Sequence, residues 1–187
     1  MDYKNYFDKS VDYLTYQNEF ITKSNNPSAY NFGEYIPMNQ HRSARIDRTF
    51  ELSEEQKHIA KETTKRTWLV ISEHWCGDAS QIIPVMNKIA EASEGKINFR
   101  LVYRDEVPEL MNAHLTNGGM AVPKIIQLDE HFELFNDWGP RPKAAQEMVI
   151  KLKSDPETAA NYIEELHKWY AHDKQKSTVA ELLDLLR

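Results

Sequence analysis

Short runs of β-branched and other apolar residues punctuate the chain and predict strands. Residues 67–72 are almost continuously apolar, which is typical of a strand buried on both faces, as in a parallel sheet. Residues 97–103 form a second run of this kind. Residues 124–128 predict a third strand, and residues 132–135 predict a fourth that returns beside it as a hairpin.

Apolar residues at helical spacing occupy much of the remaining chain. Ser53 is followed three residues later by Gln56, the spacing of a capping box, and this predicts a helix to about residue 65. Further helices are predicted over residues 145–152, 156–170 and 179–186. The helix expected after the first strand has a stripe formed by Ile82, Ile83, Met86, Ile89 and Ala90.

The order of these elements divides the chain into three parts. Residues 51–150 read as strand, helix, strand and hairpin, which predicts a mixed α/β sheet. Residues 1–50 form an N-terminal helical extension, in which a helical opening is followed by a polar loop at 24–28 and irregular chain to about residue 47. Residues 151–187 form C-terminal helices packed on the main domain. The extension either packs on that domain or offers a face to a partner. Its apolar stripe consists of Tyr3, Phe7, Val11, Leu14 and Phe20.

Composition restricts the classes of protein to which the chain can belong. Its 187 residues include 23 Lys and Arg against 29 Asp and Glu, a net charge of −6, which argues against a nucleic-acid partner. No run of about 18 apolar residues predicts a membrane span, and the N-terminus lacks a signal-peptide pattern. We therefore expect a cytoplasmic protein that binds neither nucleic acid nor membrane.

Metal and phosphate chemistry have no motif in this sequence. A single cysteine, Cys76, excludes an intrachain disulfide and a multi-cysteine zinc site. The seven histidines show no metal-ligand spacing, and no glycine-rich phosphate loop occurs. We expect neither a metal nor a resident cofactor.

Cys76 is the strongest candidate for chemistry because it follows the buried strand and opens the next helix. A thiol at a helix N-terminus faces unpaired N–H groups and the positive end of the helix dipole, so its pKa is expected to fall below the free value of about 8.5. The alternative is that Cys76 is a small buried hydrophobic residue. Its position between Trp75 and Gly77 favours the reactive interpretation.

These residues resemble the thioredoxin superfamily. Trp75-Cys76-Gly77 is similar to the first half of the thioredoxin active-site motif, and Pro84 matches the proline that bends the active-site helix. Val122-Pro123 matches the cis-proline motif. Gly139, sixteen residues further on, matches a glycine of the active-site surface. The pair of motifs Trp-Cys-Gly-Asp and Trp-Gly-Pro-Arg-Pro, the latter at residues 138–142, is similar to a bacterial thioredoxin-like branch.

The resemblance implies a thioredoxin-like three-layer α/β/α sandwich with a mixed sheet, plus the N-terminal extension and extra C-terminal helices. It also implies a substrate surface beside the sulfur, where an extended segment pairs with the backbone of Val122 as an added strand. The expected substrate-binding residues are Trp75, Gly77, Val122, Pro123, Gly139 and Arg141.

The departures from the family matter equally. Ala79 stands where a two-cysteine site has its resolving thiol, so the chain cannot form an intramolecular disulfide. Val70 stands where thioredoxins have a buried aspartate as proton acceptor. Ser80 is the nearest hydroxyl; it either bonds a thiolate or caps a backbone group.

Three charged or titratable residues bear on the thiol. Asp78 repels a thiolate and so opposes the lowering of the Cys76 pKa by the helix N-terminus. His74 either compensates as a cation or is an exposed loop residue. Arg141 either binds a thiolate or substrate carboxylate or is a solvated residue in a tight turn.

Two functions remain open at this point. The first is thiol–disulfide exchange by Cys76, with His74 and Ser80 assisting, on a protein or small-molecule disulfide. Glutathione or another low-molecular-weight thiol is then needed to resolve the mixed disulfide. The second is a redox-inactive binding module that recognises extended peptides at the proline edge. A homodimer linked or gated through Cys76 is a further alternative.

Overall fold

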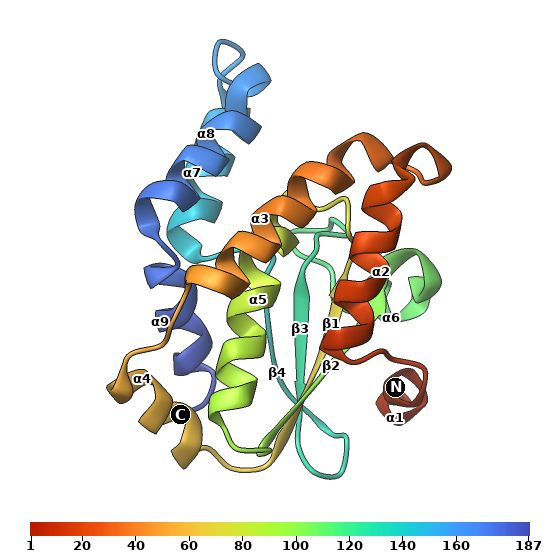
Figure 1. The fold of residues 1–187 in the computed structure, drawn as a ribbon, viewed down its shortest axis with the longest axis vertical. Coiled ribbons are helices and arrows are strands. Elements are labelled where there is room, and N and C mark those ends of the chain that lie inside the picture. The colour runs from red at the N-terminus through yellow and green to blue at the C-terminus, as the bar shows by residue number, and fades with distance from the viewer.

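A four-stranded mixed sheet forms the centre of the molecule (Figure 1). This computed structural model describes residues 1–187. The strand order is β2-β1-β3-β4; β1 runs parallel to β2, whereas β3 is antiparallel to both β1 and β4. The strands are β1 (Arg66–Ser72), β2 (Ile97–Tyr103), β3 (Lys124–Leu128) and β4 (Leu134–Trp138). The first three match the predicted strands to within one residue, and β4 begins two residues later than predicted.

The central position of β1 explains its uninterrupted apolar sequence. Val70 lies opposite Leu101 of β2 on one side and Ile125 of β3 on the other, and all three are fully buried. Helices cover both faces, so neither side of β1 meets solvent. The next element, α5 (Gly77–Ala92), therefore starts at a fixed point at the end of the most deeply buried strand.

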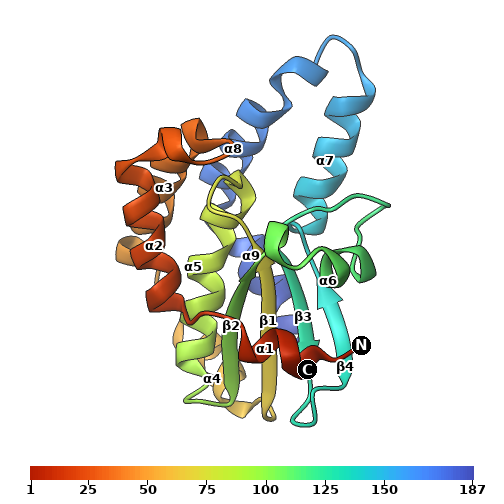
Figure 2. The same cartoon turned by 90° about the vertical axis from the view of Figure 1, so that its right-hand side faces the viewer.

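Helices on both sides of the sheet make a three-layer α/β/α sandwich. α5 and α9 (Lys176–Asp184) lie against one face, and α1 (Tyr3–Asp8) and α6 (Pro108–Ala113) lie against the other (Figure 2). α4 (Glu54–Glu62) packs on α5 and α9. The capping box predicted at its start is present, since Ser53 and Gln56 exchange side-chain and backbone hydrogen bonds.

The N-terminal stripe is not one helix. The chain breaks between α1 and α2 (Tyr13–Asn25), where Val11 pairs with Leu101 as an isolated antiparallel bridge. Asp12 caps α2 by accepting a hydrogen bond from the backbone N–H of Thr15 at 2.8 Å. Of the predicted stripe only Phe20 is fully buried and Leu14 is exposed, so the expectation of one continuous helix with an apolar face was wrong.

The segment expected to be irregular contains a long helix, α3 (Ile36–Thr49), which packs across α5. The buried residues of α3 are Ile36, Asn39, Ser43 and Ile46. Two of these four are polar, so the buried face does not read as an apolar stripe. The prediction of irregular chain here was wrong for that reason.

The C-terminal helices α7 (Lys143–Ser154) and α8 (Tyr162–Asp173) pair with each other and extend beyond the end of the sheet (Figure 2). α8 begins six residues later than predicted, after a turn and a 3-10 segment, Ala159–Asn161. No helix combines the length and apolar character needed to cross a bilayer.

Candidate functional site around Cys76

Cys76 lies in the loop between β1 and α5, at the N-cap position of the helix. The residue is 8% exposed. Its Sγ donates a hydrogen bond to the carbonyl oxygen of Val122 at 3.1 Å. The Val122–Pro123 peptide bond is cis. The sulfur therefore faces the proline edge that the resemblance implied, and the carbonyl at that edge is already occupied.

The environment of Cys76 favours the thiol over the thiolate. Burial is the main cause and the charge of Asp78 the second; together they raise the pKa of Cys76 to about 12. The backbone N–H groups of Ala79 and Asp78, and the charge of Arg141, lower that pKa by less. The predicted fall in the pKa was therefore wrong, because removal of the sulfur from water outweighs the helix end.

His74 is neither a cationic partner of the thiol nor an exposed loop residue. It is 1% exposed, and its ring packs among those of Tyr16, Phe20 and Tyr103 at centroid distances of 4.2, 4.6 and 5.3 Å. Its Nε2 lies 3.1 Å from the carbonyl oxygen of Tyr16 and donates to it. Burial lowers the pKa of His74 to about 3, so the ring is neutral and cannot favour a thiolate.

Arg141 lies beside the site but is bound to Asp78. Its Nη2 is 2.5 Å from Asp78 Oδ2, and its Nε is 3.1 Å from each carboxylate oxygen. Tyr170 donates to Asp78 Oδ1 at 2.6 Å, and Arg141 Nη1 donates to Gln146 at 2.8 Å. Both side chains of the ion pair are largely buried, at 15% and 7% exposure. The guanidinium is therefore neither solvated nor free to bind a substrate carboxylate.

Ser80 and Gly77 have structural contacts of their own. Ser80 Oγ donates to the carbonyl oxygen of Gly77 at 2.7 Å, which is the backbone-capping alternative rather than a bond to Cys76. A Cβ on Gly77 would lie 2.9 Å from the His167 ring. The glycine in this motif thus gives room to an imidazole from α8.

Gly139 packs closely against the backbone of Pro123. Its φ of +125° is accessible mainly to glycine, and a Cβ there would lie 2.3 Å from the carbonyl oxygen of Pro123. The following bond, Gly139–Pro140, is also cis, and no motif in the sequence indicated it. The predicted residues Val122, Pro123 and Gly139 are therefore brought together where β3 begins and β4 ends.

Trp75 is half-buried beside the thiol loop. Its ring packs on Phe32 at 5.4 Å, and the guanidinium of Arg104 lies 4.6 Å from its centroid. Its carbonyl oxygen accepts a hydrogen bond from Asn39 Nδ2 at 2.8 Å. α3 therefore fixes the backbone of this loop.

Comparison with protein families decides the affiliation of the chain. A family model described as Thioredoxin matches residues 26–156, which is more than half of the sequence. The chain belongs to the thioredoxin family. No curated protein matches it.

Two solved structures share the fold of this thioredoxin-family chain. A protein of unknown function from Pseudomonas aeruginosa is 18% identical with a TM-score of 0.61, covering 79% of this chain and 83% of that one. An HIV epitope-scaffold is 16% identical with a TM-score of 0.66, covering 99% and 97% of the two chains. At such identities the likeness establishes architecture alone.

Sequence reasoning missed the residues that this thioredoxin-family chain adds to the site from its terminal helices. They are Asn39 and Arg42 on α3, and His167 and Tyr170 on α8. Arg42 Nη1 donates to Asn39 Oδ1 at 3.0 Å. Arg42 thus orients the Asn39 amide, whose nitrogen donates to the Trp75 carbonyl oxygen. No local motif marks them, because their roles depend on how α3 and α8 pack over α5.

Proposed function

We propose that this thioredoxin-family chain is a binding protein whose cysteine is redox-inactive at neutral pH. The observation that carries the proposal is the bond from Cys76 Sγ to the Val122 carbonyl oxygen at 3.1 Å. A thiol that donates a hydrogen bond is protonated, and the raised pKa of Cys76 agrees with that state. Since only the thiolate is an effective nucleophile, the resting site is unreactive.

The ligand we propose is an extended peptide with apolar side chains, bound along the edge at Val122. The loop that leads to this residue exposes Leu115 and Met120, at 39% and 51%. Phe32, which packs on Trp75, is 55% exposed. Apolar side chains on both sides of the thiol loop would give such a peptide contacts that do not need the sulfur.

The thiol test is an ultraviolet titration of Cys76. We expect no thiolate below about pH 9, because a free cysteine already titrates near about 8.5 and this one is raised. Reaction with a water-soluble alkylating reagent should be correspondingly slow in the folded protein and fast in the unfolded protein. Thiolate formation near pH 7 would contradict the proposal.

The binding test uses an immobilised array of short apolar peptides. Cys76→Ser should bind them as the wild type does, whereas Met120→Asp should weaken binding by about tenfold through loss of apolar contact. Leu14→Asp is the matched control, since Leu14 is 70% exposed on α2. Equal weakening by the two aspartates, or loss of binding in Cys76→Ser, would contradict this function.

A second candidate is single-cysteine exchange, which one observation favours. The backbone N–H groups of Asp78 and Ala79 and the charge of Arg141 would all favour a thiolate once it formed. The thiolate would attack a disulfide RSSR, giving the mixed disulfide Cys76–S–S–R and RS⁻. An external thiol R′SH would then restore Cys76–SH and leave RSSR′. Mixed disulfides trapped on Cys76 in oxidised samples would favour this candidate over the first.

A further inference from the structure

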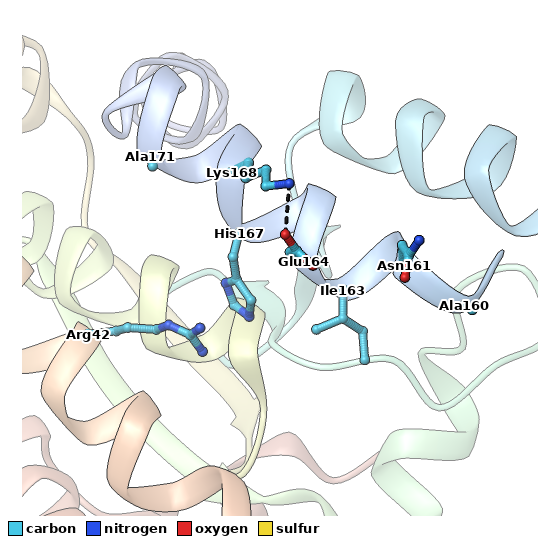
Figure 3. Close-up of a pocket in the computed structure, with 8 residues that line it drawn as sticks. All are labelled: Arg42, Ala160, Asn161, Ile163, Glu164, His167, Lys168 and Ala171. Atoms are coloured by element: carbon cyan, nitrogen blue, oxygen red, sulfur yellow. Dashed lines mark ion pairs between the residues drawn. The ribbon is translucent and has the colours of Figure 1, made fainter. Parts of the chain in front are cut away.

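A long groove lies between α3 and α8 and borders the thiol site through Arg42, His167 and Tyr170. Its two halves have volumes of about 610 and 730 Å³, and both are lined by Arg42, His167 and Ala171. Figure 3 shows Arg42 and His167 pointing toward each other across it. The size of each half is that of a site for a small organic molecule.

The second half of the groove carries uncompensated positive charge. Arg42, Arg45 and Lys174 line it, against one carboxylate, Glu51. None of the three cations forms an ion pair, although the protein as a whole has a net charge of −6. Arg42 and Arg45 are one turn apart on α3, so their side chains share a face of that helix. Lys174 comes from the far end of α8.

A buried amide also lines this half. Gln81, on α5, is 4% exposed, and its Oε1 has no hydrogen-bond partner in the protein. A half-turn of the terminal amide exchanges its oxygen and nitrogen, so the same side chain offers an N–H donor to a ligand in the groove. An unpartnered buried amide facing a groove costs free energy unless a ligand or water satisfies it.

The first half has a different character. Its walls include the small or apolar residues Ala160, Ile163 and Ala171. Besides the shared Arg42, its charged residues are Lys168 and Glu164, which form an ion pair at 2.8 Å (Figure 3). His167 is neutral near pH 7, because burial and the charge of Arg42 lower its pKa to about 4. Arg42 lines both halves, and the second half adds Arg45 and Lys174, so positive charge is concentrated in the second half.

We propose that this groove binds a small organic phosphate, with the phosphate group at Arg42, Arg45 and Lys174 and the organic part toward Ile163. Two guanidinium groups and an ammonium suit a dianionic phosphate, which arginine binds through paired N–H donors. The proposal is independent of the state of Cys76. It does connect with that loop, because Arg42 binds Asn39 and His167 packs on Gly77.

The test measures binding of glycerol 2-phosphate, inorganic phosphate and malonate by calorimetry at constant ionic strength. We expect glycerol 2-phosphate to bind most tightly, and inorganic phosphate to bind at the same place more weakly. Nuclear magnetic resonance should then show ligand-induced shifts at the Gln81 side-chain amide. Malonate binding more tightly than both phosphates would overturn the phosphate assignment. So would the absence of binding by either phosphate at millimolar concentration.

Two double variants with the same change in charge locate the site. Arg45→Gln/Lys174→Gln removes two groove cations and leaves the Arg42–Asn39 bond intact; we expect at least tenfold weaker binding. Arg48→Gln/Lys176→Gln removes two exposed cations that do not line the groove, one from α3 and one from the start of α9. This variant should bind as the wild type does. Equal losses in the two would mean non-specific charge attraction and would overturn the proposal. Thermal unfolding of both variants checks that each is folded.

Discussion

Cys76 lies between two buried regions, which differ in how they accommodate a titratable side chain. On one side, His74 is enclosed by Tyr16, Phe20 and Tyr103 and is kept neutral. On the other side, Asp78 is equally buried but forms an ion pair with Arg141. We call these the aromatic cluster (His74, Tyr16, Phe20, Tyr103) and the ion-pair cluster (Asp78, Arg141, Tyr170, Gln146).

The contrast explains why the pKa of Cys76 is raised. The aromatic cluster keeps His74, the cation expected on the N-terminal side of the loop, neutral. In the ion-pair cluster, the positive charge of Arg141 is directed to a carboxylate rather than to the sulfur. Neither region supplies Cys76 with a free positive charge, so burial determines its protonation state.

The largest expected effect is in the ion-pair cluster. Arg141→Met leaves the Asp78 carboxylate buried without its cation, and we expect the free energy of unfolding to fall by about 3–5 kcal/mol. Urea denaturation measures this loss. Asp78→Asn/Arg141→Met removes both charges and should recover part of it. A loss below about 1 kcal/mol in the single variant would mean that the pair behaves as a solvated surface contact.

Tyr170→Phe sharpens the same comparison. It removes one hydrogen bond to the Asp78 carboxylate, and bonds to charged groups contribute about 1.5–3 kcal/mol. Denaturation in urea should show a loss in this range. In Arg141→Met/Tyr170→Phe the two losses should not add, because both residues act on one carboxylate. Strict additivity would contradict the description of these residues as one cluster.

The aromatic cluster should appear in the pH dependence of stability. The folded-state pKa of His74, about 3, lies below the ordinary value, so the unfolded chain takes up the proton first as the pH falls. The stabilisation by the neutral ring is complete above about pH 6.5 and is lost as the pH falls toward the folded pKa. Between pH 7 and 5, wild type should lose about 2 kcal/mol more than His74→Phe.

Replacement of an exposed histidine, His131→Phe, is the control for this measurement. Its pH dependence between these values should follow the wild type. Parallel curves for wild type and His74→Phe would mean that the His74 ring takes up its proton at the same pH in the folded and the unfolded chain, which would contradict its lowered pKa.

The smallest effect concerns a neutral hydrogen bond in the aromatic cluster. Tyr16 OH and Ser72 Oγ lie 3.0 Å apart, and both residues are buried. Tyr16→Phe should lower stability by about 1 kcal/mol, the usual contribution of such a bond. Tyr16→Phe/Ser72→Ala removes both partners and should cost little more than the single change. A loss as large as that of Arg141→Met would remove the distinction between the two clusters.

Most of the sheet was predictable from the sequence because a strand that is buried on both faces is apolar along its whole length. β1 is apolar throughout, since both of its faces are covered, and the capping box at Ser53 is a local interaction within four residues. α3 escaped prediction because Asn39 and Ser43 occupy half of its buried positions. Residues buried by apolar packing can thus be recognised from their spacing, whereas residues that satisfy a buried polar loop cannot.

The site was predicted in position but not in chemistry. The resemblance of these motifs to thioredoxin implied that Cys76, Pro123 and Gly139 would meet. In the structure Cys76 bonds the residue before Pro123, and Gly139 packs on Pro123. The direction of the Cys76 pKa shift was wrong, because it depends on burial that no local motif encodes. Arg141 could be placed near the site from its motif, but its pairing with Asp78 requires the tertiary structure.

The bridge between Val11 and Leu101 has a consequence for how sheets of this protein can associate. It occupies the outer side of β2 with the chain's own N-terminal segment, reinforced by Arg100 bonding to Ser10. Unpaired backbone groups along a sheet border invite other strands. A strand from a second molecule would have to displace this bridge to pair along the whole of β2, whereas no such segment pairs with the outer side of β4, so β4 is the border at which addition meets less competition.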